Sequence, residues 1–196
     1  LPIKEVDLYT SNEAVGAHSE YIRDGLIWPV WRNNLIRIIE EGNFRQVCCM
    51  MTINSLCLYS ITEFMDDMFS LKEKYGANNP TIDLNILRWP VFMSPLNLPN
   101  VEKIKLHKRI SIWFEEKTKH PLMLDHERAQ IERLLDYIRV VDQGHVAAED
   151  DKVKHFHDFK SFYEQYDKRR GKDFRTTFPE LAEWYNTIEV DYTIPK

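Results

Sequence analysis

The sequence predicts an α/β fold, because three short β-like segments alternate with helical patterns and only helical patterns follow them. The β-like segments are rich in apolar and β-branched residues and lie at 6–10, 47–53 and 82–87. Their starts are about 40 residues apart, which is typical of successive βαβ units with parallel strands. We therefore expect a partial parallel (β/α) barrel of about three βα units at 1–100 and an all-helical extension at 101–196.

The first unit combines a short strand with a clearly marked helix. A helix is predicted from Trp28-Pro29, because proline suits a first helical turn and apolar residues recur on one face. Gly42 stands where the C-terminal cap is expected. Between the strand and this helix, around Gly16, the pattern predicts a loop.

The second strand is predicted to be buried on both faces, because 47–53 is apolar except for Thr52. Ser60 and Glu63 form a capping-box pattern, so a helix is expected to start there and to end near Gly76. The third strand, in contrast, alternates more clearly between apolar and polar residues.

The remainder of the chain reads as an irregular segment, several helices and a linker. The irregular segment carries three prolines. In chain order we expect a loop at 88–100, helices at 101–117 and 125–141, a small and charged linker at 144–154, an aromatic helix at 156–170 and a last short helix from about 177.

Three parallel strands cannot close into a barrel, since a complete (β/α)₈ barrel takes about 250 residues. The outer edge of the first strand would be bare. The sequence also starts at Leu1 without an initiator methionine. We therefore expect this chain to be a fragment whose missing N-terminal half lies upstream or in a partner.

Composition narrows the class of protein. The 196 residues are 43% hydrophobic and 29% charged, with 26 Lys and Arg against 31 Asp and Glu, a formal net charge of −5. This acidic balance argues against general nucleic-acid binding. No apolar run approaches the roughly 20 residues that span a bilayer, and the amino end lacks a secretory pattern, so we expect no membrane association and a cytoplasmic protein.

Polar residues gather where the predicted strands end, which is where parallel α/β sheets bind ligands. Their hydroxyl, amide and guanidinium groups suit the carboxylate, amine and ribose of a small polar ligand. Equally, they are ordinary turn and cap residues. The set comprises Ser11, Asn12, Glu13, Thr52, Asn54, Asn85, Arg88 and Trp89.

Metal and thiol chemistry is less well supported. Cys48, Cys49 and Cys57 are expected to be reduced core residues, because they lack the spacing of a disulfide framework. His155 and His157 superficially resemble the paired histidines of barrel metallohydrolases, but they open a helix, on which residues two apart diverge. A metal-dependent hydrolase is therefore kept only as an alternative, and no metal ligand is assigned.

The same residues resemble the radical SAM superfamily, specifically its twitch or SPASM-like phage and bacterial members. Residues 10–16 followed by 20–26 (EYIRDGL) are similar to the fourth-strand segment of that family, 51–56 to the fifth and 84–90 to the sixth. The tail at 166–174 and 178–181 is similar to the C-terminal end of the same proteins. The resemblance covers nearly the whole chain.

This resemblance implies the second half of a partial (β/α)₆ barrel that binds S-adenosylmethionine (SAM) beside a 4Fe–4S cluster. The complete enzyme would cleave SAM to a 5′-deoxyadenosyl radical and abstract a hydrogen atom from a substrate. By matched position, Ser11 and Arg23 would hold the SAM carboxylate or ribose, Asn54 the ribose or methionine part, and Leu87 and Arg88 would border the adenine. Asn12 belongs to the same cofactor-binding set, although Asn12-Glu13 departs from the S-x-D form common in the family.

The cluster loop Cys-x3-Cys-x2-Cys of that family is absent from this chain. We therefore expect the chain alone to hold neither SAM nor a 4Fe–4S cluster tightly and to be inactive without its N-terminal half. The substrate is open between a peptide, a sugar and a nucleotide. The competing hypothesis is a non-catalytic α/β binding or structural module.

Overall fold

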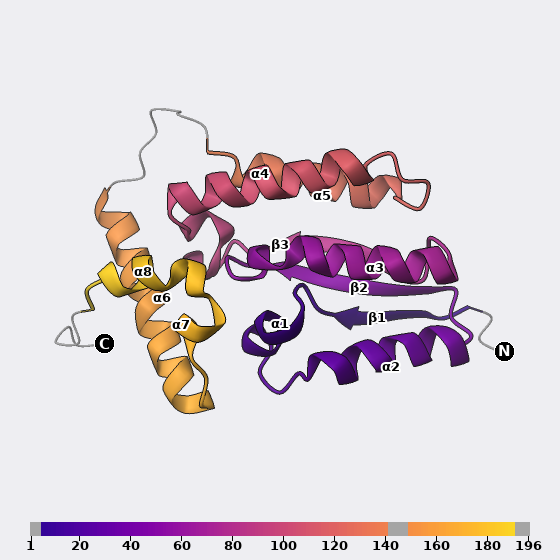
Figure 1. Ribbon diagram of the computed structural model, residues 1–196, viewed down its shortest axis with the longest axis horizontal. Coiled ribbons are helices and arrows are strands. Elements are labelled where there is room, and N and C mark those ends of the chain that lie inside the picture. The colour runs from indigo at the N-terminus through magenta and orange to yellow at the C-terminus, as the bar shows by residue number, and fades with distance from the viewer. Residues whose placement is uncertain (1–4, 141–148, 191–196) are drawn as a thin grey trace.

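The computed structural model describes residues 5–140 and 149–190, with side chains described outside 149–151, and contains one small sheet and many helices (Figure 1). Short 3₁₀ turns are labelled η. The described elements are, in chain order, β1 (Asp7–Ser11), α1 (Gly16–Ile22), α2 (Trp28–Glu41), β2 (Gln46–Ile53), η1 (Cys57–Tyr59), α3 (Ile61–Tyr75), β3 (Thr81–Ile86), η2 (Val91–Met93), η3 (Pro95–Asn97), α4 (Asn100–Lys117), α5 (Asp125–Ile138), α6 (Glu149–Arg170), α7 (Phe174–Thr177) and α8 (Pro179–Thr187).

The sheet has the order β1-β2-β3, and both strand pairs are parallel. Each strand lies within one residue of its predicted bounds, and the helix α2 begins at Trp28 and ends before Gly42 as expected. The mixed α/β class with a parallel sheet is therefore confirmed. A three-stranded sheet of this size does not by itself establish a barrel.

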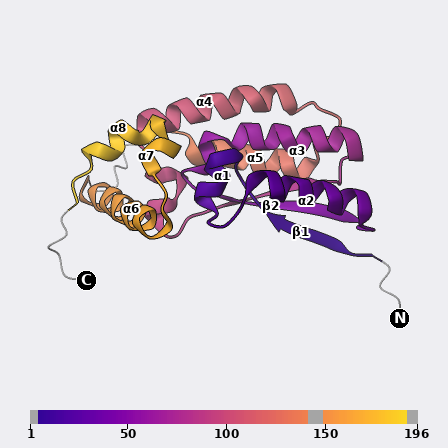
Figure 2. The same cartoon turned by 60° about the horizontal axis from the view of Figure 1, so that its bottom comes forward.

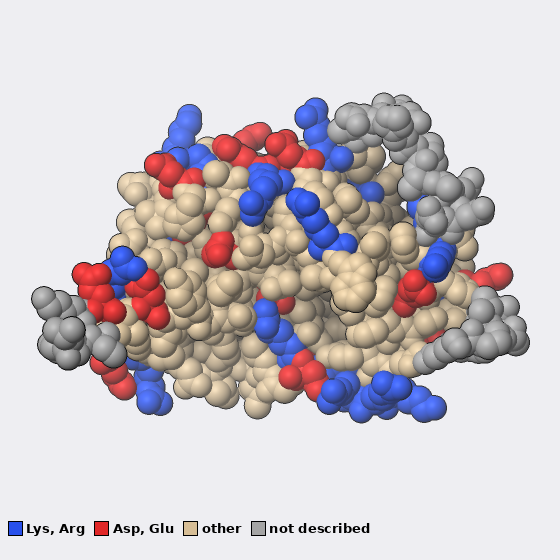
Figure 3. All heavy atoms as spheres, turned by 180° about the vertical axis from the view of Figure 1, so that it is seen from behind, with Lys and Arg blue, Asp and Glu red and all other residues tan. Residues whose placement is uncertain are grey.

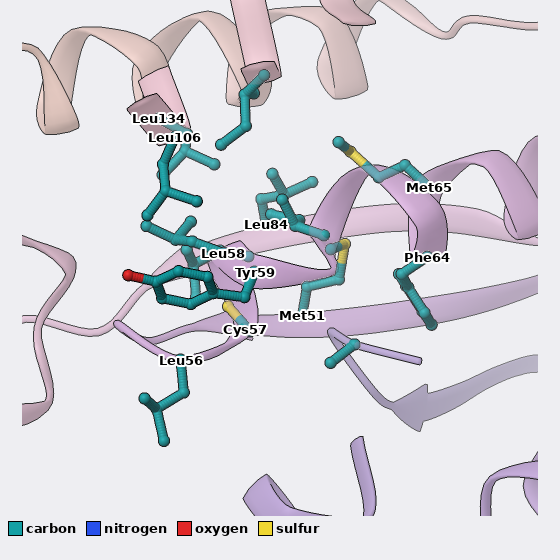
Figure 4. Close-up of a cluster of buried hydrophobic side chains, with 14 of the residues drawn as sticks. Met51, Leu56, Cys57, Leu58, Tyr59, Phe64, Met65, Leu84, Leu106 and Leu134 are labelled. Atoms are coloured by element: carbon teal, nitrogen blue, oxygen red, sulfur yellow. The ribbon is translucent and has the colours of Figure 1, made fainter. Parts of the chain in front are cut away.

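One face of the sheet is apolar and is covered by α2 and α3 (Figure 2). In the register, Met51 of β2 pairs with Leu84 of β3, and both side chains are fully buried. They belong to the same cluster as Phe64 and Met65 of α3 (Figure 4). Burying side chains of this size contributes about 1.5–3 kcal/mol each, so this face anchors the fold.

The opposite face of the sheet carries apolar and polar side chains and is open toward the carboxyl ends of the strands, whereas Cys48 and Thr81 on the same face are buried. Successive side chains of a strand alternate between faces, so Tyr9, Met50, Thr52 and Asn85 project away from α2 and α3. All four are exposed, Tyr9 most strongly at 61%. Seen from behind, much of the surface is uncharged, and charged side chains lie along the border with several more across the middle (Figure 3).

The free edge of β3 is closed by side chains of α5. The backbone N–H of Ile82 donates to Glu127 at 2.9 Å, and that of Leu84 donates to Gln130 at 2.8 Å. The carbonyl of Leu84 accepts from Arg133 at 2.8 Å. These bonds replace those that a neighbouring strand would make, so the sheet does not continue past β3.

The edge of β1 is different. The N–H of Asn12 donates to Met50 and the carbonyl of Val6 accepts from Arg45, so the even-numbered residues of β1 direct their backbone groups to β2. The backbone groups of Asp7, Tyr9 and Ser11 therefore point outward. Within the described residues no strand pairs with this edge, as the sequence predicts.

The C-terminal helices pack against α1 at the end of the molecule toward which the strands point (Figure 1). Tyr21 of α1 donates from its hydroxyl to Asp167 at 2.7 Å, and its own carbonyl accepts from the Tyr166 hydroxyl at 2.7 Å. His18 stacks on Phe178 with ring centroids 4.6 Å apart. These contacts fix the helical extension beside the carboxyl edge of the sheet.

Several local expectations are wrong. Residues 16–22 form the helix α1 rather than a loop, and 149–154 are helical rather than part of a linker; the remaining linker residues, 144–148, lie outside the described part. Helix α3 does follow Ser60, but no capping-box bond forms, because the Ser60 hydroxyl accepts instead from the Val15 N–H at 3.3 Å. The segment after β3 contains the turns η2 and η3.

Among the described helices, none combines the length and apolar character that crossing a bilayer requires.

Candidate functional site

The candidate site lies at the carboxyl edge of the sheet, where all three parallel strands end on the same side. Ser11 is the last residue of β1, Ile53 of β2 and Ile86 of β3. The segments that leave these strands carry the residues expected from the sequence to bind a ligand. Parallel sheets bind ligands at this edge because loops there are free to present side chains and backbone N–H groups.

Asn12 is fully buried and holds the turn between β1 and α1. Its Oδ1 accepts from the Glu13 N–H at 2.9 Å and from the Ser19 hydroxyl at 2.8 Å. Its Nδ2 has no hydrogen-bond partner among the described residues. The Oδ1 atom of this carboxamide therefore stabilises the turn, and its Nδ2 group is a buried donor whose described surroundings offer no acceptor.

Glu13 and Arg23 form an ion pair next to this turn. The guanidinium of Arg23 lies 2.5 Å from Oε2 of Glu13, whose side chain is only 3% exposed, whereas the Arg23 side chain is 28% exposed. Burial raises the pKa of Glu13, and the adjacent Arg23 acts in the opposite direction. The pair leaves part of a guanidinium facing solvent, held in place by a buried carboxylate.

Asn54 holds the turn after β2. Its Oδ1 accepts from the N–H groups of Leu56 and Cys57 at 2.9 and 3.0 Å, and its Nδ2 donates to the carbonyl of Thr52 at 3.2 Å. Such a side chain replaces backbone partners at the start of η1. The described bonds thus account for this carboxamide as a turn former.

Leu87 and Arg88 follow β3. The N–H of Leu87 donates to the carbonyl of Ile53 at 2.9 Å, so it extends the pairing with β2, and its side chain is half-buried. Arg88 is exposed, with its guanidinium 5.7 Å from the ring centroid of Tyr137. Neither of these residues approaches Arg23 through an interaction found in the described part of the chain.

Further polar side chains lie on the open face, where Asn85 donates to the Asp83 carboxylate. Ser11, Thr52 and Asn85 come from three different strands, share the face of Tyr9 and Met50, and are exposed. The sequence identifies the three polar residues by their place near strand ends. It does not identify Tyr9 or Met50 as part of this face. In the case of Met50, the continuous apolar run of its strand does not indicate which residues face outward.

The described residues do not form a metal centre. No group of three or more His, Cys, Asp or Glu side chains among them could hold an ion, and His155 and His157 lie on α6. Cys48, Cys49 and Cys57 are all buried and unpaired, and burial raises the pKa of each thiol. Thiolates are the ligands of an iron–sulfur cluster, so these cysteines do not fit one.

Comparison with family models, with curated proteins and with solved structures gave no match for this chain. What the fold defines is therefore a class: a mixed α/β protein with a three-stranded parallel sheet, one covered face, one open face and a helical extension.

Proposed function

We propose that this chain is the second half of a radical SAM partial barrel and that it contributes part of the SAM site at the carboxyl edge of its sheet. The observation that carries the proposal is that the two edges of the sheet differ in their backbone hydrogen bonding. Side chains of α5 occupy the backbone groups of β3, whereas the outward groups of β1 are bare. A sheet built this way is complete on one side and ready to continue on the other.

The two faces of the sheet support the same conclusion. In a barrel, helices cover the outer face of each strand and the inner face looks into the interior. Here α2 and α3 cover one face, and the face of Tyr9, Met50, Thr52 and Asn85 is open. Further strands added at β1 would curve this open face into an interior lined with hydroxyl, amide and thioether groups and the Asp83 carboxylate.

The donor set at the carboxyl edge fits SAM in kind. The guanidinium of Arg23 suits a carboxylate, and the hydroxyls and amide of Ser11, Thr52 and Asn85 suit ribose and amine groups. In the proposed site Arg23 orients the carboxylate of the ligand, and the small polar side chains orient the rest against the open face. Leu87 and Arg88 are proposed to border the adenine.

A 4Fe–4S cluster does not fit the cysteines of this chain, so it would have to be held by the missing half. We derive no catalytic step from this chain alone. Its proposed role is to bind and orient SAM. The proposed substrate is a peptide, and the residues that bind the substrate and the cluster are proposed to lie in the complete polypeptide.

A non-catalytic α/β module is the second candidate, and the two asparagines favour it. The Oδ1 atoms of Asn12 and Asn54 are occupied by turn-forming bonds, which explains these residues without a ligand. In that case the open face and the bare edge of β1 serve only to dock another protein.

Anaerobic reconstitution with iron and sulfide separates these candidates when it is applied to the complete polypeptide that contains this chain. The radical SAM proposal expects cluster absorbance, SAM binding and formation of 5′-deoxyadenosine. Arg23→Gln should raise the KM for SAM about tenfold through loss of a charged hydrogen bond, whereas Arg37→Gln, on the exposed surface of α2, should not. A polypeptide that takes up neither cluster nor SAM would instead favour the module.

A further inference from the structure

A hollow of about 450 Å³ lies away from the carboxyl-edge residues, between the segment that follows β3 and the helices α6 and α8. Its walls are formed by Leu96, Leu98 and Pro99 on one side and by Phe156 and Trp184 on the other. None of the residues proposed to bind SAM lines it. The volume falls within the range of small-molecule sites, about 300–1,000 Å³.

A second hollow of about 510 Å³ adjoins the first and shares Phe156 and Trp184 with it. The two rings meet edge to face, with centroids 5.1 Å apart. Apolar side chains around both hollows are exposed, among them Leu96 at 44% and Val153 at 60%. Apolar surface of this kind in a concave place is typical of a binding site.

The lining of the first hollow also includes a cation, Lys103. Lys103 of α4 is half-buried, and its Nζ donates to the carbonyl of Leu96 at 3.2 Å. No carboxylate among the side chains that the structure describes, which leaves out those of 149–151, lies at ion-pair distance from it, although Lys105 and Lys117 of the same helix are paired. Burial lowers the pKa of Lys103, and the positive charge of Lys152 adds to this effect.

Two further groups of the same hollow can carry positive charge, Lys152 and His155. The only carboxylate among the described residues that line either hollow is Glu189, and it belongs to the second. The first hollow thus carries the cationic groups, and aromatic and aliphatic side chains make up much of the lining of both hollows. A charged group lacking a partner in an apolar site favours a ligand that brings the opposite charge.

We propose that this groove binds an amphiphilic carboxylate, a small molecule with one anionic head and an apolar body. The head lies at Lys103, with Lys152 and His155 nearby. The body lies against Phe156 and Trp184 and extends toward the second hollow. Glu189 disfavours a second anionic group at that far end, so the ligand carries its charge at one end only.

Isothermal titration of the complete chain with three probes of equal tail length tests this site. The probes are decanoate, decanol and decyltrimethylammonium, at concentrations below their aggregation thresholds. Decanoate should bind most tightly. Lys103→Met should weaken decanoate at least about tenfold, the effect of one charged hydrogen bond, and leave decanol unchanged. Lys108→Met, an exposed lysine on the same helix, is the matched control and should leave both affinities unchanged.

Lys103→Arg keeps the charge and should retain most of the decanoate affinity, which separates the role of the charge from any effect on folding. Equal binding of all three probes, or no loss in Lys103→Met, would overturn the proposal. The site depends on no step of the radical SAM chemistry, so its failure and the failure of the proposed function are distinguishable.

Discussion

Glu127 of α5 accepts the backbone N–H of Ile82 at 2.9 Å and thereby ends the sheet at β3. The same carboxylate accepts from the Leu124 N–H at 3.0 Å and from Nζ of Lys72 at 2.6 and 2.7 Å. Neither side chain of the Lys72–Glu127 pair is exposed. One buried carboxylate therefore joins α3, β3 and the start of α5, and closing the sheet edge depends on keeping that carboxylate neutralised.

Lys72→Met is predicted to destabilise the protein by about 3–5 kcal/mol, because it leaves the Glu127 carboxylate buried without its cation. The free energy of urea unfolding measures this loss. Lys74→Met is the control on the same helix. Lys74 is 64% exposed and pairs with Glu40 on the surface, so the expected change is below about 1 kcal/mol.

Adding Glu127→Gln to Lys72→Met should recover part of the lost stability, since an amide costs less to bury than an unpaired charge. If Lys72→Met and Lys74→Met unfold at the same urea concentration, the buried pair does not stabilise the closed edge.

Tyr9→Pro tests whether the outer edge of β1 pairs with another strand, because it is predicted to block that pairing without destabilising this chain. The N–H of Tyr9 points away from β2, so proline removes a donor that the chain does not use and should leave the unfolding free energy within about 1 kcal/mol of Tyr9→Val. If, as proposed, this chain is part of a longer polypeptide in which β1 takes another strand, the same substitution should abolish cluster uptake or assembly there, whereas Tyr9→Val should not.

The opposite outcome would contradict this prediction. If the longer polypeptide carrying Tyr9→Pro assembles and is active as normal, no strand pairs with β1 at this position, and the proposed continuation of the sheet is wrong.

Arg23→Met is predicted to destabilise the protein by about 2 kcal/mol near pH 8, because Glu13 is buried beside it and would lose its cation. The fold raises the pKa of Glu13 above its ordinary value of about 4.5. The free energy of unfolding therefore falls as the pH rises from that ordinary value through the higher pKa of the folded state, because the buried carboxyl group ionises. Removing Arg23 should enlarge this loss. Denaturation near pH 5 and pH 8 should show a larger difference for Arg23→Met than for the wild type.

The double variant Arg23→Met with Glu13→Gln provides the control, because it removes both charges of the pair. It should be more stable than Arg23→Met alone near pH 8 and should lose the extra pH dependence. A double variant that is no more stable than the single one would show that Glu13 is not held by Arg23.

The sequence predicts the strands and the long helices well because their signals are local. The apolar run at 47–53 is buried in the middle of the sheet, and Trp28-Pro29 and Gly42 mark the ends of α2. Helix α1 is missed because its N-cap, Val15, makes no side-chain capping bond. Its position depends on tertiary contacts such as that of Tyr21 with Asp167, which are distant in sequence.

The candidate site is predictable in place but less so in detail. Residues near strand ends are found from topology alone, whereas the Oδ1 bonds of Asn12 and Asn54 depend on how each turn folds. The closure of β3 has a weak sequence signal, three polar residues at three-residue spacing on α5, Glu127, Gln130 and Arg133. That spacing indicates one helix face but does not reveal that the face meets a strand edge.

His18 is predicted to make the docking of the C-terminal helices sensitive to acid. Its Nε2–H donates to the carbonyl of Thr177 at 3.0 Å and its ring stacks on Phe178. Burial lowers the pKa of His18; the Thr177 carbonyl, Glu180 and Glu63 oppose this shift, and Arg109 adds to it. The unfolded state therefore binds a proton more readily than the fold. The contribution of His18 to stability is fully present above about pH 6.5 and is lost as the pH falls through the lower folded value.

His18→Phe should remove this part of the pH dependence, since phenylalanine keeps the stacking and carries no proton. Thr177→Ala keeps the accepting carbonyl and should retain the acid sensitivity of the wild type, apart from a small loss from its own hydroxyl bond to Asp173. Chemical denaturation between about pH 4.5 and 7.5 measures both slopes. An unchanged slope in His18→Phe would mean that the acid sensitivity arises from other groups.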